Sequence, residues 1–146
     1  MPATHNFHIG ELSARTGRSI HALRWYESQG LMPGVLRDRG GRRLYVDLHL
    51  SWVDLIDRLR RTGMSIAQIR EYAALVKRGN STLKRRRALL AAHRKQVEAR
   101  IVEWTLALEL IDYKIDFYGQ WLATGRRPKL ALPSRFRNPQ TKRRKP

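Results

Sequence analysis

The chain has 146 residues, a formal net charge of +18 and no cysteine, so disulfides and thiolate metal sites are excluded. A hydrophobic content of 42% beside 29% charged residues predicts one compact domain with an extended element. The longest apolar runs, 72–76 and 88–92, are far shorter than the roughly 20 residues that cross a bilayer. Residues 1–7 lack an apolar signal region, and we therefore expect a soluble cytoplasmic protein.

Two short helices about a tight turn are predicted near the start of the chain. Ile9 and Leu12 give the first helix an apolar face, and Gly17 tolerates positive φ where that helix ends. Ser19 is a favourable N-cap for a second helix, in which Leu23 continues the helical spacing. This pattern is typical of a helix-turn-helix, whose second helix presents its first turn to base edges in the major groove. The outward residues of that turn are Ser19, His21 and Arg24.

A basic β-hairpin is predicted next. Segments 35–37 and 43–46 flank residues 38–41, which carry two adjacent glycines at the tip. We interpret this hairpin as a wing beside the helix-turn-helix. Combined with the net charge, the arrangement indicates binding to double-stranded DNA.

Most of the remaining chain reads as helix. Asp47 is the predicted N-cap of a helix that runs to Gly63, and Ser65 is the predicted N-cap of the next. The residues expected to face the core are Leu48, Trp52, Leu55, Ile56 and Leu59 in the first of these helices, and Ile66, Ile69, Tyr72, Ala73 and Val76 in the second.

A long helix over about 82–122 shows heptad spacing. Apolar residues recur there at alternating steps of three and four for more than four heptads. A helix of this size is on the order of 60 Å long, more than one small domain can cover, so we expect a homodimer. The predicted dimerisation seam comprises Leu90, Val97, Ile101, Trp104, Leu108, Ile111, Ile115 and Tyr118.

The order of these motifs closely resembles the MerR family of bacterial transcription regulators. The resemblance rests on Ile-Gly-Glu-Leu at 9–12, Leu-Arg-aromatic-Tyr-Glu at 23–27, Gly-Leu at 30–31 and Gly-x-Arg-Leu-Tyr at 41–45. It continues through 62–69 and covers about residues 7–122. Trp25 stands where the family usually has Tyr, and Arg42 stands where an aromatic or apolar wing residue is common.

The resemblance implies a mainly α fold, in which a winged helix-turn-helix is followed by an antiparallel coiled coil. The domains are then 7–79 for DNA binding, 80–123 for dimerisation and 124–146 for a basic tail. A two-fold dimer predicts a palindromic operator. Family members typically bend and untwist an overlong promoter spacer so that RNA polymerase can engage both promoter elements.

The predicted DNA-binding side chains come from the recognition helix and the wing. We expect Arg24 to read bases and Trp25 and Tyr26 to position the phosphate backbone. Arg42, Arg43 and Tyr45 are expected to anchor the wing. The full set is Ser19, His21, Arg24, Trp25, Tyr26, Arg37, Arg42, Arg43 and Tyr45. No catalytic, metal or cofactor site is predicted, and we expect a regulator in the bacterial cytoplasm, associated with the nucleoid. The alternative is an architectural or excisionase-like DNA-bending protein without an inducer, which the long helix disfavours.

The nature of any effector stays open. The downstream sequence is similar to the aldehyde- or electrophile-responsive branch of the family, but its reactive cysteine is replaced by Arg58. His93 is expected to be a hydrogen-bonded interface residue rather than a ligand. An aromatic cluster is either interface core or the lining of a pocket for a small apolar ligand; it comprises Trp104, Tyr113, Phe117, Tyr118 and Trp121.

The segment after Gly125 is strongly basic. It holds nine of the 30 Lys and Arg residues and no acidic residue, which leaves a formal +9 for the preceding part. We expect a disordered tail that either adds salt-sensitive phosphate affinity or only improves solubility.

Overall fold

The computed structural model describes residues 6–129 and Phe136. Its elements confirm a mainly helical fold in which a small hairpin interrupts the helices. In chain order they are α1 (Ile9–Thr16), α2 (Ile20–Ser28), β1 (Leu36–Arg37), β2 (Arg43–Leu44), α3 (Asp47–Arg61), α4 (Ile66–Lys77), the 3-10 helix η1 (Asn80–Thr82) and α5 (Leu83–Thr124). Most of the predicted tail, residues 130–135 and 137–146, lies outside the described residues.

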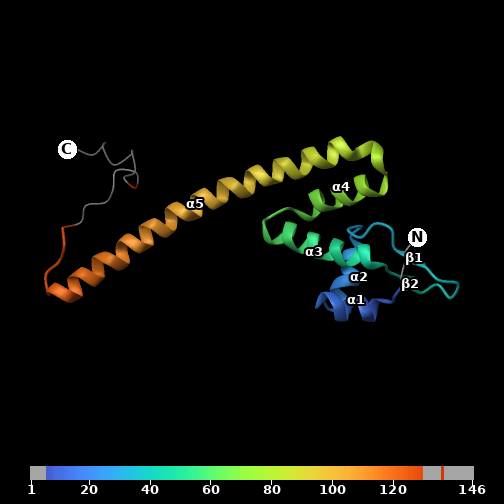
Figure 1. The fold of residues 1–146 in the computed structure, drawn as a ribbon, viewed down its shortest axis with the longest axis horizontal. Helices are drawn as coiled ribbons and strands as arrows, with labels where there is room; N and C mark the ends of the chain where they lie inside the picture. Colours follow the sequence, from blue (N-terminus) through green and yellow to red (C-terminus); the bar gives the residue numbers. More distant parts are fainter. Residues whose placement is uncertain (1–5, 130–135, 137–146) are drawn as a thin grey trace, which may run out of the picture. The chain divides into compact units, whose positions relative to one another are not determined.

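The turn between α1 and α2 follows the predicted chemistry. Gly17 ends α1 in the left-handed region with φ of +67°, and its N–H donates to the Ser13 carbonyl at 2.9 Å. Ser19 is the N-cap of α2, and its Oγ accepts a hydrogen bond from the N–H of Ala22 at 3.1 Å. Only Arg18 and Ser19 separate this glycine from α2, so the two helices meet at a tight turn, and Figure 1 shows them beside α3.

The wing is a two-stranded antiparallel hairpin. Leu36 pairs with Leu44, and Arg37 pairs with Arg43. At its tip the Asp38 Oδ1 atom accepts hydrogen bonds from the backbone N–H groups of Gly40 and Arg42, both at 2.9 Å. These bonds lower the pKa of Asp38, the N–H of Arg42 contributing most. The Asp38 side chain therefore restrains the backbone of the turn at the tip of the wing.

The start of α3 differs from the prediction. Asp47 is the first helical residue rather than the N-cap, and its carboxylate accepts a hydrogen bond from Arg15 Nη2 on α1 at 2.9 Å. Val46 is the N-cap, and its N–H donates to Nδ1 of the buried His49 at 2.9 Å. The Ser65 cap of α4 is confirmed, with reciprocal bonds between Ser65 and Gln68.

One hydrophobic core holds the first four helices together. Trp52 packs against it and donates from Nε1 to the Leu31 carbonyl at 2.6 Å, while its ring stacks on Tyr72. Leu48, expected in the core, is instead 73% exposed in the first turn of α3. The cluster comprises Phe7, Leu12, Leu23, Tyr26, Leu31, Met32, Tyr45, Val53, Ile56, Leu59, Met64 and Ile69.

Helix α5 begins as part of this same unit. Leu89 and Leu90 pack against the core, and His93 Nε2 lies 2.8 Å from the Thr62 Oγ1 atom at the end of α3. This contact confirms the hydrogen bond predicted for His93, while its predicted place in an interface stays a prediction. Leu90, assigned to the dimer seam, is half-buried and packs against the core of its own chain, so its place in the seam stays a prediction. The chain divides into two compact units between Val97 and Glu98.

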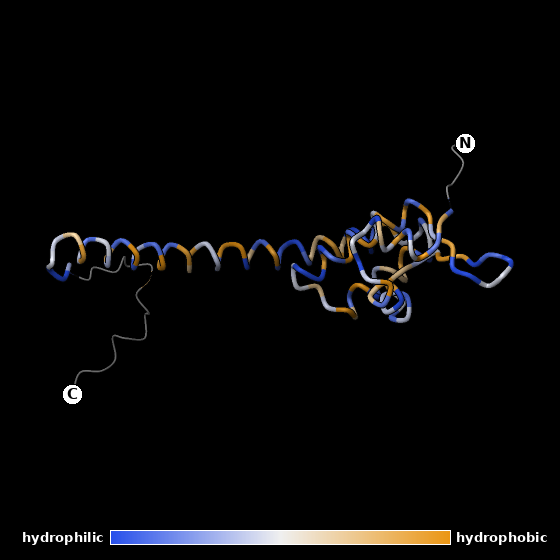
Figure 2. The backbone as a smooth tube through the Cα atoms, turned by 90° about the horizontal axis from the view of Figure 1, so that it is seen from below, coloured by the Kyte–Doolittle hydropathy of each residue, from blue (hydrophilic) through white to orange (hydrophobic). Residues whose placement is uncertain are grey.

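The second unit carries the remaining predicted seam. After the half-buried Val97, apolar residues recur along α5, as the orange segments of the backbone tube in Figure 2 show. In the single chain the predicted seam residues beyond Val97 are all more than half exposed: Ile101, Trp104, Leu108, Ile111, Ile115 and Tyr118. Phe117, by contrast, is buried and contacts the rings of Tyr118 and Trp121. Within the described residues, no helix is long and apolar enough to cross a membrane.

Candidate nucleic-acid interface

The recognition helix α2 has one buried and one exposed face. Leu23 and Tyr26 point into the core, whereas Ser19, His21 and Arg24 are exposed. The Arg24 guanidinium makes no ion pair within the described part of the chain. The first turn of α2 therefore offers polar side chains that are available to an external ligand.

A basic hollow of about 230 Å³ lies next to this helix. It is lined by Arg24 from α2, by Arg42 and Arg43 from the wing, and by His8 and Ile9 at the start of α1. The unpaired N–H groups of a helix N-terminus attract anions, and the three arginines add positive charge, of which that of Arg24 has no acidic partner within the described residues. The size and charge of this hollow suit a phosphate group of a nucleic acid backbone.

His8 was not among the predicted DNA-binding residues. Its Nδ1 lies 3.0 Å from the Arg43 carbonyl, so it joins the start of α1 to the wing. In the sequence His8 is an isolated histidine without ligand spacing, and no local signal marks it. Only the return of the wing to α1, through backbone bonds between Phe7 and Tyr45, brings it to the hollow.

The wing arginines are held by local partners. Arg37 Nη1 donates to the Gly41 carbonyl at 2.8 Å, and Arg42 Nε donates to Asp38 at 2.9 Å. Arg43 Nε donates to Glu27 of α2 at 2.5 Å, an ion pair that raises the pKa of Arg43. The carboxylates partly compensate the charges of Arg42 and Arg43, and all three contacts restrain the direction of the side chains.

Two predicted DNA-contacting residues have buried side chains. Tyr26 is 3% exposed, and its hydroxyl donates to Asp57 Oδ1 at 2.6 Å. Tyr45 is fully buried against His49, and its burial raises its pKa. Burial of the Tyr26 side chain argues against the direct phosphate contact expected of it, whereas burial of Tyr45 is compatible with its expected role of anchoring the wing. Both tyrosines belong to the hydrophobic core on which α2 and the wing rest.

Trp25 retains a place on the surface, with 37% of its side chain exposed. The guanidinium carbon of Arg60, from α3, lies 5.4 Å from the Trp25 ring centre. Arg60 is itself exposed and extends the positive surface beside α2. In the sequence, Arg60 is one of three basic residues in the last turn of α3, beside Arg58 and Arg61. The sequence alone therefore gave no reason to assign Arg60, rather than its neighbours, to the interface.

The residue types at this surface favour binding to a polyanion. Among residues 6–129 and at 136, no group of three or more His, Cys, Asp or Glu side chains could hold a metal ion. The exposed side chains are mainly cationic, with Trp25 beside them, which suits contacts to phosphates.

Comparison with known proteins gives consistent matches. A family model described as "MerR HTH family regulatory protein" matches residues 7–75, and one described as "MerR, DNA binding" matches residues 50–111. An HTH-type transcriptional regulator of Haemophilus influenzae is 35% identical over 119 residues, or 82% of this chain and 88% of that protein. The HTH-type transcriptional regulator AdhR of Bacillus subtilis is 33% identical over 89 residues, or 61% of this chain and 64% of AdhR.

The solved structures that resemble this chain are also MerR family regulators. HiNmlR, a MerR family regulator lacking the sensor domain and crystallised with promoter DNA, is 33% identical with a TM-score of 0.72. That match covers 83% of this chain and 96% of HiNmlR. A MerR family structure from Listeria monocytogenes is 34% identical with a TM-score of 0.76, covering 82% of this chain and 90% of that one.

Proposed function

The chain belongs to the MerR family of helix-turn-helix transcriptional regulators, and we propose that it binds promoter DNA as a homodimer and controls transcription by bending and untwisting that DNA. The observation that carries this proposal is the basic hollow, in which the start of α1, the recognition helix and the wing converge. Promoter DNA in the HiNmlR crystal structure supports the choice of ligand.

Each element has a separate task in this proposal. Arg24 reads base edges from α2, because its guanidinium is exposed and makes no internal ion pair in the described chain. Ser19 and His21 contact the DNA beside it, and Trp25 donates its indole N–H to a phosphate. Arg42 and Arg43 hold the adjacent backbone through the hollow that they share with Arg24.

Dimerisation follows from the apolar seam of α5. Six large apolar side chains that are more than half exposed in one chain would be stabilised by burial against a second copy. We propose the antiparallel coiled coil of the family, which gives a two-fold dimer and a palindromic operator. Arg24 of each copy then reads one half-site.

Regulation would act on DNA shape. Bending a duplex costs several kcal/mol, so a signal that changes the angle between the two DNA-binding units alters the promoter available to RNA polymerase. Arg58 occupies the position of the branch cysteine and pairs with Asp54 at 2.8 Å, so this position performs no thiol chemistry. The aromatic cluster around Phe117 is the candidate site for a small apolar effector. We place the protein in the bacterial cytoplasm, at the nucleoid, without a catalytic role.

Selection of duplexes from a randomised pool, followed by footprinting of the best site, tests the proposal. We expect a palindrome whose centre becomes distorted when the protein binds. Unselective binding would contradict a regulator and favour an architectural DNA-bending protein.

A further inference from the structure

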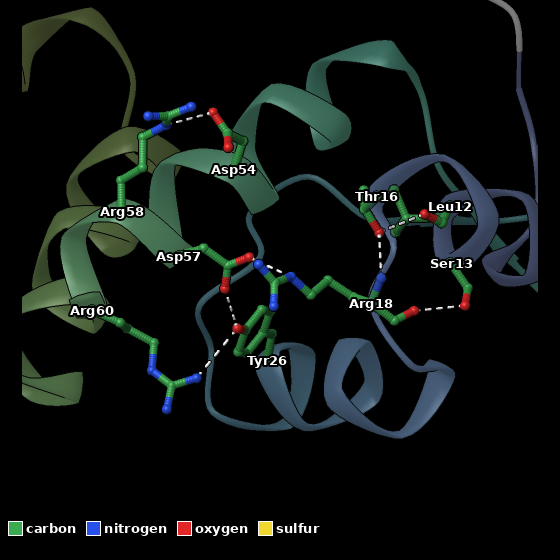
Figure 3. A network of polar contacts seen from close by, with 9 residues as sticks. All are labelled: Leu12, Ser13, Thr16, Arg18, Tyr26, Asp54, Asp57, Arg58 and Arg60. Carbon is green, nitrogen blue, oxygen red and sulfur yellow. Dashed lines mark hydrogen bonds and ion pairs between the residues drawn. The ribbon is translucent and has the colours of Figure 1, made fainter.

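The Asp57 carboxylate on α3 contacts two separate parts of the helix-turn-helix. Its Oδ2 atom lies 2.5 Å from Arg18 Nε, and its Oδ1 atom accepts the 2.6 Å hydrogen bond from the Tyr26 hydroxyl. Figure 3 shows both contacts converging on this one carboxylate. The Asp57 side chain is 12% exposed and that of Arg18 35% exposed, so the ion pair is partly shielded from water.

Arg18 lies in the tight turn directly before α2. Its carbonyl accepts a hydrogen bond from Ser13 Oγ at 2.6 Å, and its N–H donates to Thr16 Oγ1 at 3.4 Å. The end of α1 therefore holds the backbone of Arg18 while Asp57 holds its guanidinium. Ser19 follows as the N-cap, so these contacts lie directly beside the start of α2.

The second contact lies further along α2. Tyr26 is on the inner face of the helix, and its hydroxyl also accepts a hydrogen bond from Arg60 Nη1 at 3.2 Å. Arg60 in turn covers the Trp25 ring. The pKa of Tyr26 is raised by burial and by its bond to Asp57, so the hydroxyl stays protonated and donates.

We propose that Asp57 is a positioning residue for DNA reading: it holds both ends of α2 against α3, so that Arg24 reaches base edges. The inference rests on the proposed function. Asp57 has no direct role at the DNA, since its two oxygens face Arg18 and Tyr26. Without it, α2 would occupy the reading position for a smaller fraction of the time, and the apparent affinity would fall by that fraction.

Asp54 provides a matched control on the same helix. It pairs with Arg58 at 2.8 Å, but both side chains are more than 60% exposed and both belong to α3. Asp57→Asn and Asp54→Asn change the net charge equally. Removal of a negative charge near DNA by itself strengthens binding, so the electrostatic effect and the positioning effect have opposite signs for Asp57→Asn.

The experiment compares wild type, Asp57→Asn and Asp54→Asn on two duplexes of equal length. One is the duplex that the wild-type chain selects from a randomised pool, and the other is its scrambled counterpart. We expect Asp57→Asn to bind the selected duplex about tenfold more weakly and the scrambled duplex within about twofold of wild type. Asp54→Asn should retain wild-type affinity or bind slightly more tightly on both.

Tyr26→Phe removes only the hydroxyl and keeps the ring, so it tests the second contact if Asp57→Asn fails to fold. It should reduce affinity for the selected duplex. It should also change the fluorescence of Trp25, which is measured in a variant whose other three tryptophans are replaced by Phe (Trp52→Phe, Trp104→Phe, Trp121→Phe). Equal losses on both duplexes would indicate a general stability effect and overturn the inference, as would equal behaviour of the two Asn variants. If wild type selects no sequence, the proposed function fails first and this inference fails with it.

Discussion

Replacement of Arg24 by Ala tests the central assignment of the interface. The side chain is exposed and has no internal ion pair within the described residues, and Ala is the most favourable helix residue. The free energy of unfolding should therefore stay within about 0.5 kcal/mol of wild type. Any loss of DNA affinity can then be attributed to the missing contact rather than to a damaged fold.

The expected loss follows from the symmetry of the complex. One bidentate contact between arginine and guanine discriminates by about 1–3 kcal/mol. Two copies of Arg24 act on one palindrome, so the dimer should lose about 2–6 kcal/mol of specific binding free energy, or roughly 30-fold and more in affinity. Binding to random DNA should fall much less.

Fluorescence anisotropy on the selected and scrambled duplexes, repeated over a range of salt concentrations, measures both effects. A base contact leaves the salt dependence almost unchanged, whereas each lost phosphate contact reduces the slope of log K against log salt by about 0.9. Equal losses on both duplexes, with a reduced slope, would refute base reading and assign Arg24 to the phosphate backbone.

Three further predictions concern the seam, the wing and one buried histidine. Leu108→Glu places a charge on the seam in both copies and should cost about 2 kcal/mol per copy in dimer stability; sedimentation showing an unchanged dimer would exclude this seam. Glu27→Gln removes the partner of Arg43 and should lower the free energy of unfolding by about 1 kcal/mol at most; an unchanged denaturation midpoint would mean the pair contributes nothing. Burial lowers the pKa of His49, so its share of stability is present above its ordinary pKa near 6.5 and is lost as the pH falls below it. His49→Gln keeps an acceptor for the Val46 N–H and should flatten the acid side of the stability profile, whereas an unaltered profile would assign the titration elsewhere.

Local signals predicted the helix-turn-helix correctly. Gly17 supplies positive φ, and Ser19 and Ser65 supply side-chain acceptors, so each acts within a few residues of its own position. Asp47 has the same capping chemistry as Ser65, yet its carboxylate pairs with Arg15, which is far away in the sequence. Capping is thus predictable only where no tertiary partner competes for the side chain.

The composition of the site was harder to predict than its location. Helical periodicity marked α2 but could not decide between Tyr26 pointing inward and Tyr26 reaching a phosphate, because Asp57 lies on another helix. The sequence pattern also treats arginines alike, whereas the fold gives Arg43 an acidic partner and leaves Arg24 without one among the described residues. His8 joined the interface only through the return of the wing to α1.

The closed tip of the wing affects how binding specificity could change. Since Asp38 already bonds to the backbone of Gly40 and Arg42, the loop loses little conformational entropy when it meets a ligand. Arg39 is exposed between these bonded positions, and its side chain makes no hydrogen bond or ion pair within the part of the chain that the structure describes. A single substitution at Arg39 would therefore alter what the wing presents to a groove while its backbone stays in place, which offers an evolving regulator a route to new operators at little cost in folding.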